Sequence, residues 1–253
     1  MFSNYAEMYD SLYLDRPYNN EINYLHSIIE ENCSPNASIM DLGCGTGIHA
    51  LQLAKFGFQL TGIDISPEML RIANHKLLEF NQKQKLECEF LFGDILRMNS
   101  NKKYDVVISM FHVMNFFLTD VNFSAVVTRV YELLKKDGIF IFDTWNGNSV
   151  TGESFESRSK EFEFRNQKYL RTTDYTHDSR SRIVDVKFEF YNINEKKIEV
   201  SEFNENHKVR YFSKEEILKF ISNRFRIGSV VSSKSFNEAQ MSDWSVIYVL
   251  KKL

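Results

Sequence analysis

The sequence predicts an α/β fold, with a mostly parallel sheet, helices on both of its faces and an antiparallel β insert. Two observations predict the sheet. Apolar strand-like runs alternate with helical segments over residues 36–150, and a glycine-rich turn joins the first run to a helix. A third observation predicts the insert: residues 155–212 contain no glycine or proline and include runs in which apolar and polar side chains alternate.

An N-terminal helical cap, residues 1–35, is expected before the first strand. Tyr5, Tyr9 and Tyr13 stand four residues apart, and apolar residues between 22 and 29 continue a helical period, which predicts two helices. An aromatic row at this spacing either packs in a core or forms the wall of a ligand site. The sequence leaves both interpretations open.

The glycine-rich turn follows the first strand, at Asp41-Leu42-Gly43-Cys44-Gly45-Thr46-Gly47, and opens a helix at 48–56. Glycine permits positive φ angles and places no Cβ between the backbone and a ligand. We expect these glycines to serve backbone conformation rather than packing. The free N–H groups at the helix start suit hydrogen-bond acceptors on a ligand.

The residues around the turn restrict the ligand. The second apolar run, 58–63, ends in Asp64, where nucleotide-binding folds place a carboxylate on ribose hydroxyls. Ile48 occupies the place of the last glycine in the dinucleotide fingerprint, and no Gly-Lys-Ser/Thr follows the first glycine. Asp41 would repel a phosphate but attract a cationic amino acid group. These features argue against a pyrophosphate.

The next elements continue the alternation. Ser66 and Pro67 predict the start of a helix that runs to about residue 79. Strands are predicted at 86–92 and 104–110. Asp94 follows the first of these, either as a turn residue or as a binding group at the carboxyl end of a strand.

The motif at 41–47, followed by Gly62-Ile63-Asp64-Ile65-Ser66, resembles the class I S-adenosylmethionine-dependent methyltransferases. This resemblance implies a Rossmann-like, seven-stranded, mostly parallel sheet and S-adenosylmethionine as cofactor. It places the glycine loop under the methionine part, Asp64 on the ribose and Asp94 at the adenine amine. The cofactor contacts that it implies are Tyr5, Tyr13, Asp41, Gly43, Gly45, Asp64, Ile65, Met69, Asp94, Ile95 and Met110.

The segment after the fourth strand, residues 111–117, is aromatic and should face the reaction. Methyltransferases of exocyclic base amines carry a Pro-Pro-aromatic element here, and its absence argues against a nucleobase target. His112 is the expected catalytic residue, because a histidine accepts a proton near neutral pH or orients the methyl acceptor. The alternative is a hydrogen-bonded loop residue. Tyr9, Phe111 and Asn115 are expected to contact the acceptor.

The second half of the chain is predicted in the same way. A helix over 121–134 should stop at Lys135-Lys136-Asp137-Gly138, before a strand at 139–143. The insert, 151–212, has strand-like segments at about 161–165, 168–177, 182–193 and 197–211. Ser213 begins a capping box and a helix to about 223, and strands at 226–232 and 242–250 end the chain as an antiparallel pair. Residues 36–150 and 213–253 form the expected core.

Three short segments, at 143–147, 207–212 and 243–246, show a weaker similarity. They resemble sequences of a bacterial group that contains N-methyltransferases of nucleotide-linked amino sugars. In that group the β insert shapes the acceptor site or forms a dimer contact. The resemblance implies Trp145 and Arg210, and also His207, as acceptor contacts. The alternative is that they are cross-strand pairs on a solvated face.

Composition narrows the function classes. The chain has 253 residues and a net charge of −3, so it lacks the excess of positive charge that is typical of nucleic-acid-binding proteins. Without an apolar run long enough for a membrane span, a signal segment or a Cys-x-x-Cys pair, we expect a cytoplasmic protein with no metal site. We expect a small-molecule acceptor and a monomer or homodimer.

Three functional hypotheses follow. The first is methylation of the amino group of a nucleotide-linked deoxyamino sugar, and the alternative is O-methylation of a small metabolite or sugar. A protein that binds the cofactor without turnover is the third, and it predicts a blocked acceptor cavity. Ile48 disfavours an NAD-linked oxidoreductase.

Overall fold

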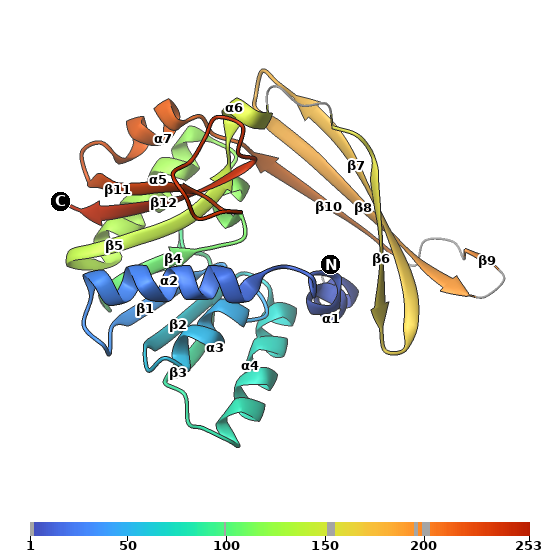
Figure 1. The fold of residues 1–253 in the computed structure, drawn as a ribbon, viewed down its shortest axis with the longest axis horizontal. Coiled ribbons are helices and arrows are strands. Elements are labelled where there is room, and N and C mark those ends of the chain that lie inside the picture. Colours follow the sequence, from blue (N-terminus) through green and yellow to red (C-terminus); the bar gives the residue numbers. More distant parts are fainter. Residues whose placement is uncertain (1–2, 99, 151–154, 195–196, 199–202) are drawn as a thin grey trace.

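The computed structural model describes residues 3–98, 100–150, 155–194, 197–198 and 203–253, and Figure 1 shows them as two sheets with surrounding helices. The core sheet has strands β1 (Ser38–Leu42), β2 (Gln59–Asp64), β3 (Cys88–Phe92), β4 (Tyr104–Ser109), β5 (Leu134–Trp145), β11 (Phe225–Ser232) and β12 (Ser245–Lys252). The insert sheet has β6 (Arg158–Phe164), β7 (Gln167–Asp178), β8 (Ile183–Asn194), β9 (Lys197–Ile198) and β10 (Phe203–Arg210). The helices are α1 (Ser3–Leu12), α2 (Tyr18–Asn32), α3 (Ile48–Ala54), α4 (Pro67–Asn81), the 3₁₀ helix η1 (Val113–Phe116), α5 (Asp120–Leu133), α6 (Gly147–Val150) and α7 (Lys214–Ile221).

The core sheet has the order β11-β12-β5-β4-β1-β2-β3. Its first five strands in the chain pair in parallel, whereas β12 lies antiparallel between β5 and β11. The predicted Rossmann-like, seven-stranded, mostly parallel sheet is confirmed. Because β1 and β4 are neighbours whose following segments leave in different directions, their carboxyl ends form the crevice in which such sheets bind ligands.

Helices cover both faces of the core sheet. Apolar residues of α2 and α3, such as Leu25 and Leu51, pack on one face with Ile39 and Ile108. On the other face, α5 and α7 pack on a separate cluster that includes Phe140. Burial of these side chains stabilises the fold by roughly 25 cal/mol per Å² of apolar surface. Among the described helices, none is long and apolar enough to cross a membrane.

Two predicted caps are confirmed, and one boundary is wrong. The Ser66 hydroxyl accepts a hydrogen bond from the Met69 N–H, and Ser213 forms the predicted capping box with Glu216. Residues 135–138 were expected between a helix and a strand, but they belong to β5. They form a bulge there, because the register with β4 shifts in this part of the strand and Asp137 takes a φ of 60°.

The insert is an antiparallel sheet with the order β10-β8-β7-β6, and β9 pairs with β8. The insert was expected to begin at 151 and to carry a strand over 197–211; residues 151–154 and 199–202 lie outside the described residues. Figure 1 shows α1 between the core and the insert sheet. There Tyr5 and Leu12 pack with Met69 of α4 and Phe190 of β8.

Candidate active site

A cavity of about 720 Å³ lies at the carboxyl ends of β1, β2 and β4, between the core sheet, α1 and the insert. Every predicted site residue except Asn115 and Arg210 lines it. The predicted residues that line it are Tyr5, Tyr9, Tyr13, Asp41, Gly43, Gly45, Asp64, Ile65, Met69, Asp94, Ile95, Met110, Phe111, His112, Trp145 and His207. The contacts that these residues would make with a bound molecule stay predictions.

The glycines of the turn have two structural roles. Gly43, Gly45 and Gly47 adopt φ angles of 73°, 53° and 78°. A Cβ on Gly45 would meet no atom within 4 Å, so the backbone there borders open space. A Cβ on Gly43 would lie 2.6 Å from the Val113 side chain, and one on Gly47 would lie 2.6 Å from the ring of Phe90. The expectation that these glycines do not serve packing is therefore wrong for two of the three.

Asp64, at the end of β2, ties the glycine-rich turn to its strand. Its Oδ2 accepts a hydrogen bond from the Gly45 N–H at 2.8 Å, and its Oδ1 accepts one from the Ser66 N–H at 2.8 Å. Burial raises the pKa of the Asp64 carboxyl above its ordinary value, and the backbone donors oppose that shift. The side chain is thus held at the cavity wall by hydrogen bonds to both of its oxygens.

Asp41 is the buried carboxylate of the cavity, with 2% of its surface exposed. Its Oδ2 has no hydrogen-bond partner among the described residues. Burial raises the pKa of Asp41 to about 6. A buried carboxylate oxygen without a donor costs free energy. An ammonium group would supply the missing donor, so the residues present fit the amino acid part of S-adenosylmethionine.

Asp94 and Ile95 follow β3 at the same edge of the sheet. The Asp94 Oδ1 accepts a hydrogen bond from the Leu96 N–H at 2.9 Å. The sequence left a turn residue and a binding group as alternatives: Asp94 has the hydrogen bond of a turn residue and lines the cavity, and its contact with a ligand stays a prediction.

The tyrosine row also combines its two predicted roles. The ring of Tyr9 lies 5.6 Å from that of Tyr5 and 4.9 Å from that of Tyr13, centroid to centroid, and the Tyr13 ring lies 4.8 Å from that of Phe111. Burial raises the pKa of Tyr5 and Tyr9 well above the ordinary tyrosine value, so both phenols are neutral. The row packs under the insert and forms the cavity wall at once.

Asp10 fastens α1, which carries the first two of these tyrosines, to the core. The Thr46 hydroxyl donates a hydrogen bond to Asp10 Oδ1 at 2.6 Å, and the Lys76 Nζ lies 2.5 Å from Asp10 Oδ2. One carboxylate therefore joins α1 to the glycine-rich turn and to α4.

His112 lies in a strained turn directly after β4. Phe111 and His112 take φ angles of 67° and 63°, which are uncommon for residues other than glycine. The His112 N–H donates to Asp143 Oδ1 at 2.7 Å, and its Nε2 lies 2.9 Å from the Ser245 Oγ. Burial lowers the pKa of His112, and the nearby Asp143 opposes that shift. The imidazole is thus neutral at pH 7 and held from one side.

The tautomer follows from these contacts. The Asp143 Oδ2 lies 3.4 Å from the His112 Nε2 and has no hydrogen-bond partner within the described part of the chain. A carboxylate beside Nε2 favours the tautomer with its proton there. Nδ1 then keeps its lone pair, and His112 is one of the residues that line the cavity.

Asn115 and Arg210 do not line the cavity, so the structure places neither beside the other predicted acceptor contacts, and their role there stays a prediction. Asn115 is fully buried, and its Nδ2 donates to the Arg210 carbonyl oxygen at 2.6 Å. The Arg210 guanidinium lies 2.6 Å from Asp120 and 3.0 Å from Glu216. Side chains alternate along β10, so His207 and Val209 line the cavity whereas Arg210 points to the helices behind it.

Several cavity residues escaped the sequence analysis. They include Tyr18, His49, Arg171, Tyr175, Val186, Phe188, Val209 and Trp244. For the insert a signal was present, because Val186 and Phe188 belong to the alternating run of β8. Alternation alone does not show which residues of the neighbouring strands lie on the same face as Val186 and Phe188, because this depends on the pairing register.

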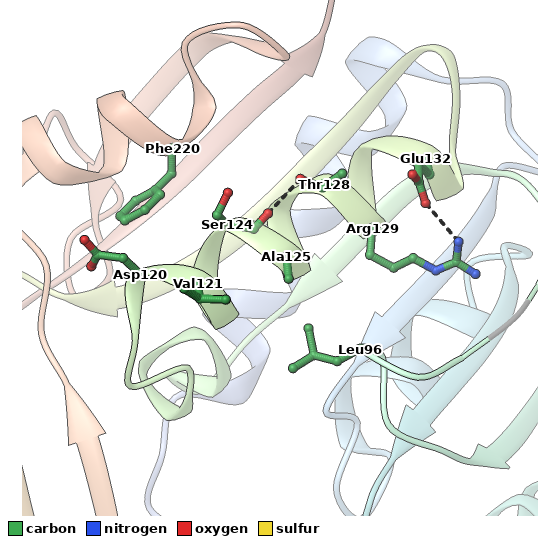
Figure 2. Close-up of a pocket in the computed structure, with 9 residues that line it drawn as sticks. All are labelled: Leu96, Asp120, Val121, Ser124, Ala125, Thr128, Arg129, Glu132 and Phe220. Carbon is green, nitrogen blue, oxygen red and sulfur yellow. Dashed lines mark hydrogen bonds and ion pairs between the residues drawn. The ribbon is translucent and has the colours of Figure 1, made fainter.

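A second hollow lies over α5 and is separate from the glycine-rich turn. Figure 2 shows its lining, in which the Arg129 Nη1 pairs with Glu132 Oε2 at 3.0 Å. It shares only Leu96 with the cavity described above. None of the predicted site residues is among its described lining residues, so we place the candidate active site in the first cavity.

The fold and the cavity together define a class I S-adenosylmethionine-dependent methyltransferase. A seven-stranded sheet with an antiparallel last strand carries a glycine-rich turn and acids at the ends of adjacent strands. A family model described as a methyltransferase domain matches residues 33–206, and the chain belongs to this family. S-adenosylmethionine is its cofactor.

Two curated relatives each share a little over half of their length with the chain. A protein of Geobacillus sp. (strain WCH70), provisionally named a methyltransferase, is 32% identical over 143 residues, which are 56% of either chain. The dTDP-3-amino-3,4,6-trideoxy-alpha-D-glucopyranose N,N-dimethyltransferase of Streptomyces venezuelae is 26% identical over 143 residues, 56% of this chain and 57% of that relative.

Solved structures match over nearly the whole chain. An S-adenosylmethionine-dependent methyltransferase from Clostridium acetobutylicum ATCC 824 superposes with a TM-score of 0.82 at 20% identity, over 99% of this chain and 98% of that one. The S-adenosylmethionine-bound amino pentose methyltransferase CalS10 from Micromonospora echinaspora gives 0.74 at 18% identity, over 97% of each chain. At these identities the likeness shows the fold.

Proposed function

We propose that this protein transfers a methyl group from S-adenosylmethionine to the amino group of a small molecule, a deoxyamino sugar linked to a nucleotide. Two similar proteins support this acceptor class, since one is named as an N,N-dimethyltransferase of a dTDP-linked amino sugar and the other as an amino pentose methyltransferase. We further propose that the insert, residues 151–212, shapes the acceptor end of the site in a cytoplasmic enzyme.

One observation carries the proposal: the cavity extends from the glycine-rich turn to the inner face of the insert without interruption. Asp41 and Asp64 line one end, whereas Tyr175 and Phe188 line the other. His112 and Trp145 lie along its wall, from the fourth and fifth strands of the core. A protein that only binds the cofactor has no need of the second end, and the blocked cavity that this alternative predicts is absent from the described residues.

Methyl transfer is an in-line displacement, so the chain must align the acceptor and keep its lone pair free. When bound, S-adenosylmethionine supplies a methyl group activated by positive sulfur. Asp41 would hold the ammonium of that cofactor, since its Oδ2 lacks a donor. Phe111 and the tyrosine row exclude water from the wall of the cavity.

His112 handles the proton of the acceptor. An amine enters the reaction with a lone pair only when it is neutral, and a protonated one must lose a proton first. The His112 Nδ1 would accept a hydrogen bond or a proton from that amine, while Asp143 and Ser245 hold the ring from the Nε2 side. The lowered pKa of His112 keeps the acceptor form of the ring populated at pH 7.

O-methylation is the second candidate, and the same histidine favours it. A hydroxyl must lose its proton as the methyl group arrives, and a neutral imidazole held by a carboxylate is suited to take it. The chain offers this arrangement at His112 and Asp143.

The test incubates the purified protein with methyl-labelled S-adenosylmethionine and matched pairs of acceptors. Each pair has a nucleotide-linked amino sugar and the same sugar with a hydroxyl in place of the amine. Mass spectrometry of the products should show label on the amine alone. Label on the hydroxyl partner would assign O-methylation instead, and label on neither would refute the proposed acceptor class.

A further inference from the structure

The insert forms one end of the cavity through side chains that alternate along three neighbouring strands. Arg171 and Tyr175 come from β7, Val186 and Phe188 from β8, and His207 and Val209 from β10. Thr173 pairs with Phe188, and Val186 pairs with His207, so these positions share one face of the sheet. This end of the cavity, which we call the insert face, is aromatic and apolar apart from Arg171 and His207.

The formal charges of the cavity are separated between its two ends. The carboxylates that line it, Asp41, Asp64 and Asp94, all lie at the carboxyl ends of core strands, where the cofactor is expected. Among the described lining residues, Arg171 is the one lysine or arginine. His207 adds no charge at pH 7, because burial lowers its pKa. The insert face therefore carries a single positive charge.

Arg171 has no ion pair among the described residues; its charge contributes, after Lys160, to the lowered pKa of the Asp15 carboxyl. Its guanidinium lies over the ring of Phe188 at 4.9 Å from the centroid, and its buried Nε has no hydrogen-bond partner among the described residues. No described carboxylate forms an ion pair with it. Arg210, on the opposite face of the insert sheet, differs because it pairs with both Asp120 and Glu216. A partly buried guanidinium without an anion is a costly arrangement for a folded chain unless a ligand completes it.

We propose that Arg171 binds the diphosphate of the methyl acceptor. This inference rests on the proposed function, in which the acceptor is a sugar linked to a nucleotide. A guanidinium presents a planar fork of N–H donors that matches two phosphate oxygens at once, and it does so best in a site sheltered from water. Phe188 already holds the guanidinium plane, so little rotamer entropy is lost when the anion binds.

The proposal also orients the acceptor. The diphosphate lies at the insert face, so the sugar is directed toward the opposite end of the cavity, where His112 and the glycine-rich turn lie. The anion is thereby kept away from Asp41 and Asp64, which would repel it. One arginine therefore selects an anionic acceptor and decides which of its ends meets the methyl donor.

The first experiment measures methyl-transfer kinetics for the nucleotide-linked amino sugar with Arg171→Met, Arg171→Lys and Lys168→Met. Arg171→Met removes the charge and the donors but keeps the length of the side chain. We expect it to raise KM for the acceptor by roughly 10- to 100-fold, with a smaller change in kcat, and Arg171→Lys to restore part of the affinity. Lys168→Met is the matched control, because Lys168 lies on the same strand, is exposed and does not line the cavity.

The second experiment needs no turnover. Calorimetry titrates protein saturated with S-adenosylhomocysteine with thymidine diphosphate, with thymidine as the uncharged probe and with succinate as a carboxylate probe. We expect thymidine diphosphate to bind the wild-type protein more tightly than thymidine does, and this advantage to disappear in Arg171→Met. Equal S-adenosylhomocysteine affinity in all variants shows that the fold is intact.

The two experiments separate the inference from the proposed function. If the amino sugar is methylated and its KM is unchanged in Arg171→Met, the role of Arg171 is refuted while the proposed function stands. If no nucleotide-linked sugar is methylated but thymidine diphosphate binds through Arg171, the diphosphate site stands and the acceptor class falls. Binding of succinate alone through Arg171 would overturn the diphosphate assignment.

Discussion

His112 and Asp143 are joined twice: the His112 N–H donates to Asp143 Oδ1 at 2.7 Å, and the His112 Nε2 lies 3.4 Å from Asp143 Oδ2. The same carboxylate therefore supports the unusual backbone of the turn and favours the imidazole tautomer with its proton on Nε2. The residues stand 31 positions apart. Asp143 does not line the cavity, so in the proposed function it is a positioning residue that acts through His112.

Asp143→Asn keeps the size of the side chain and removes its charge. Since Asp143 raises the pKa of His112 against the effect of burial, we expect that pKa to fall further in the variant. We also expect kcat to drop by about tenfold or more as the tautomer is lost. NMR titration of the histidine ring measures the pKa, and Ser245→Ala is the comparison that leaves the charge in place. An upward shift of the His112 pKa would contradict this role.

The stability of the protein should depend on pH through His112. Its pKa in the folded state lies below its unfolded value, so below about pH 6.5 the unfolded chain binds more protons than the folded one. The stability that His112 contributes is therefore present above that pH and is lost as the pH falls through the folded pKa. The free energy of unfolding, compared between wild type and His112→Asn from pH 8 to pH 5, measures this term. His207 is present in both proteins, so its contribution to the pH dependence of the unfolding free energy cancels in the comparison. A difference independent of pH would refute the shift.

Asp41→Asn should stabilise the protein and weaken its ligand binding. The pKa of Asp41 is raised to about 6, so its stabilising contribution is present below the ordinary value near 3.9 and is lost as the pH rises through 6. We expect the variant to gain on the order of 1–3 kcal/mol in unfolding free energy at pH 8, with the gain vanishing near pH 4. Chemical denaturation at the two pH values measures it. S-adenosylhomocysteine affinity should fall in the same variant, and unchanged affinity would exclude Asp41 as the ammonium partner.

Gly43→Ala should mainly reduce stability, whereas Gly45→Ala should mainly weaken the binding of S-adenosylhomocysteine. Both positions have positive φ, which costs an alanine about 1 kcal/mol. At Gly43 the new Cβ would also lie 2.6 Å from Val113, so that variant should lose more stability, and Val113→Ala should restore part of the loss. At Gly45 the methyl group meets open space, so the variant should fold and bind S-adenosylhomocysteine weakly. Thermal unfolding and calorimetry distinguish the two, and equal stability losses would contradict the packing role of Gly43.

Arg210→Met should destabilise the fold without changing acceptor recognition. Removal of the guanidinium leaves the buried Glu216 with one fewer partner, which typically costs about 3 kcal/mol. The acceptor KM of the folded protein should stay close to that of wild type, in contrast to Arg171→Met. A large change in the acceptor KM with unchanged stability would instead support Arg210 as an acceptor contact.

The sequence was sufficient for the core because its signals are local. The glycine-rich turn, the acid that ends β2 and the cap at Ser66 each depend on residues close together in the chain. Their positions on adjacent parallel strands then follow from the topology of the fold. The early start of β5 escaped prediction, because Leu134 already pairs with Tyr104 of β4, ahead of the register shift over 135–138.

The acceptor end was harder to predict because it depends on register. A shift of one residue exchanges the two faces of a strand, so Arg171 and Arg210 could not be told apart as a cavity residue and a helix contact. Asp143 escaped for a related reason. Asp143 contacts His112 across the ends of two strands. Nothing in the sequence around a carboxylate in an apolar strand indicates which distant residue it will contact.

The placement of α1 has a kinetic consequence. The helix is fastened to the glycine-rich turn through Asp10, and on its other side the Tyr5 ring lies 6.3 Å from that of Phe188 on the insert. Tyr5 and Tyr9 of this helix line the cavity, so the helix covers a molecule bound beneath them on that side. We therefore expect departure of the spent nucleoside, rather than the chemical step, to limit turnover, with the acceptor binding after the cofactor in a fixed sequence.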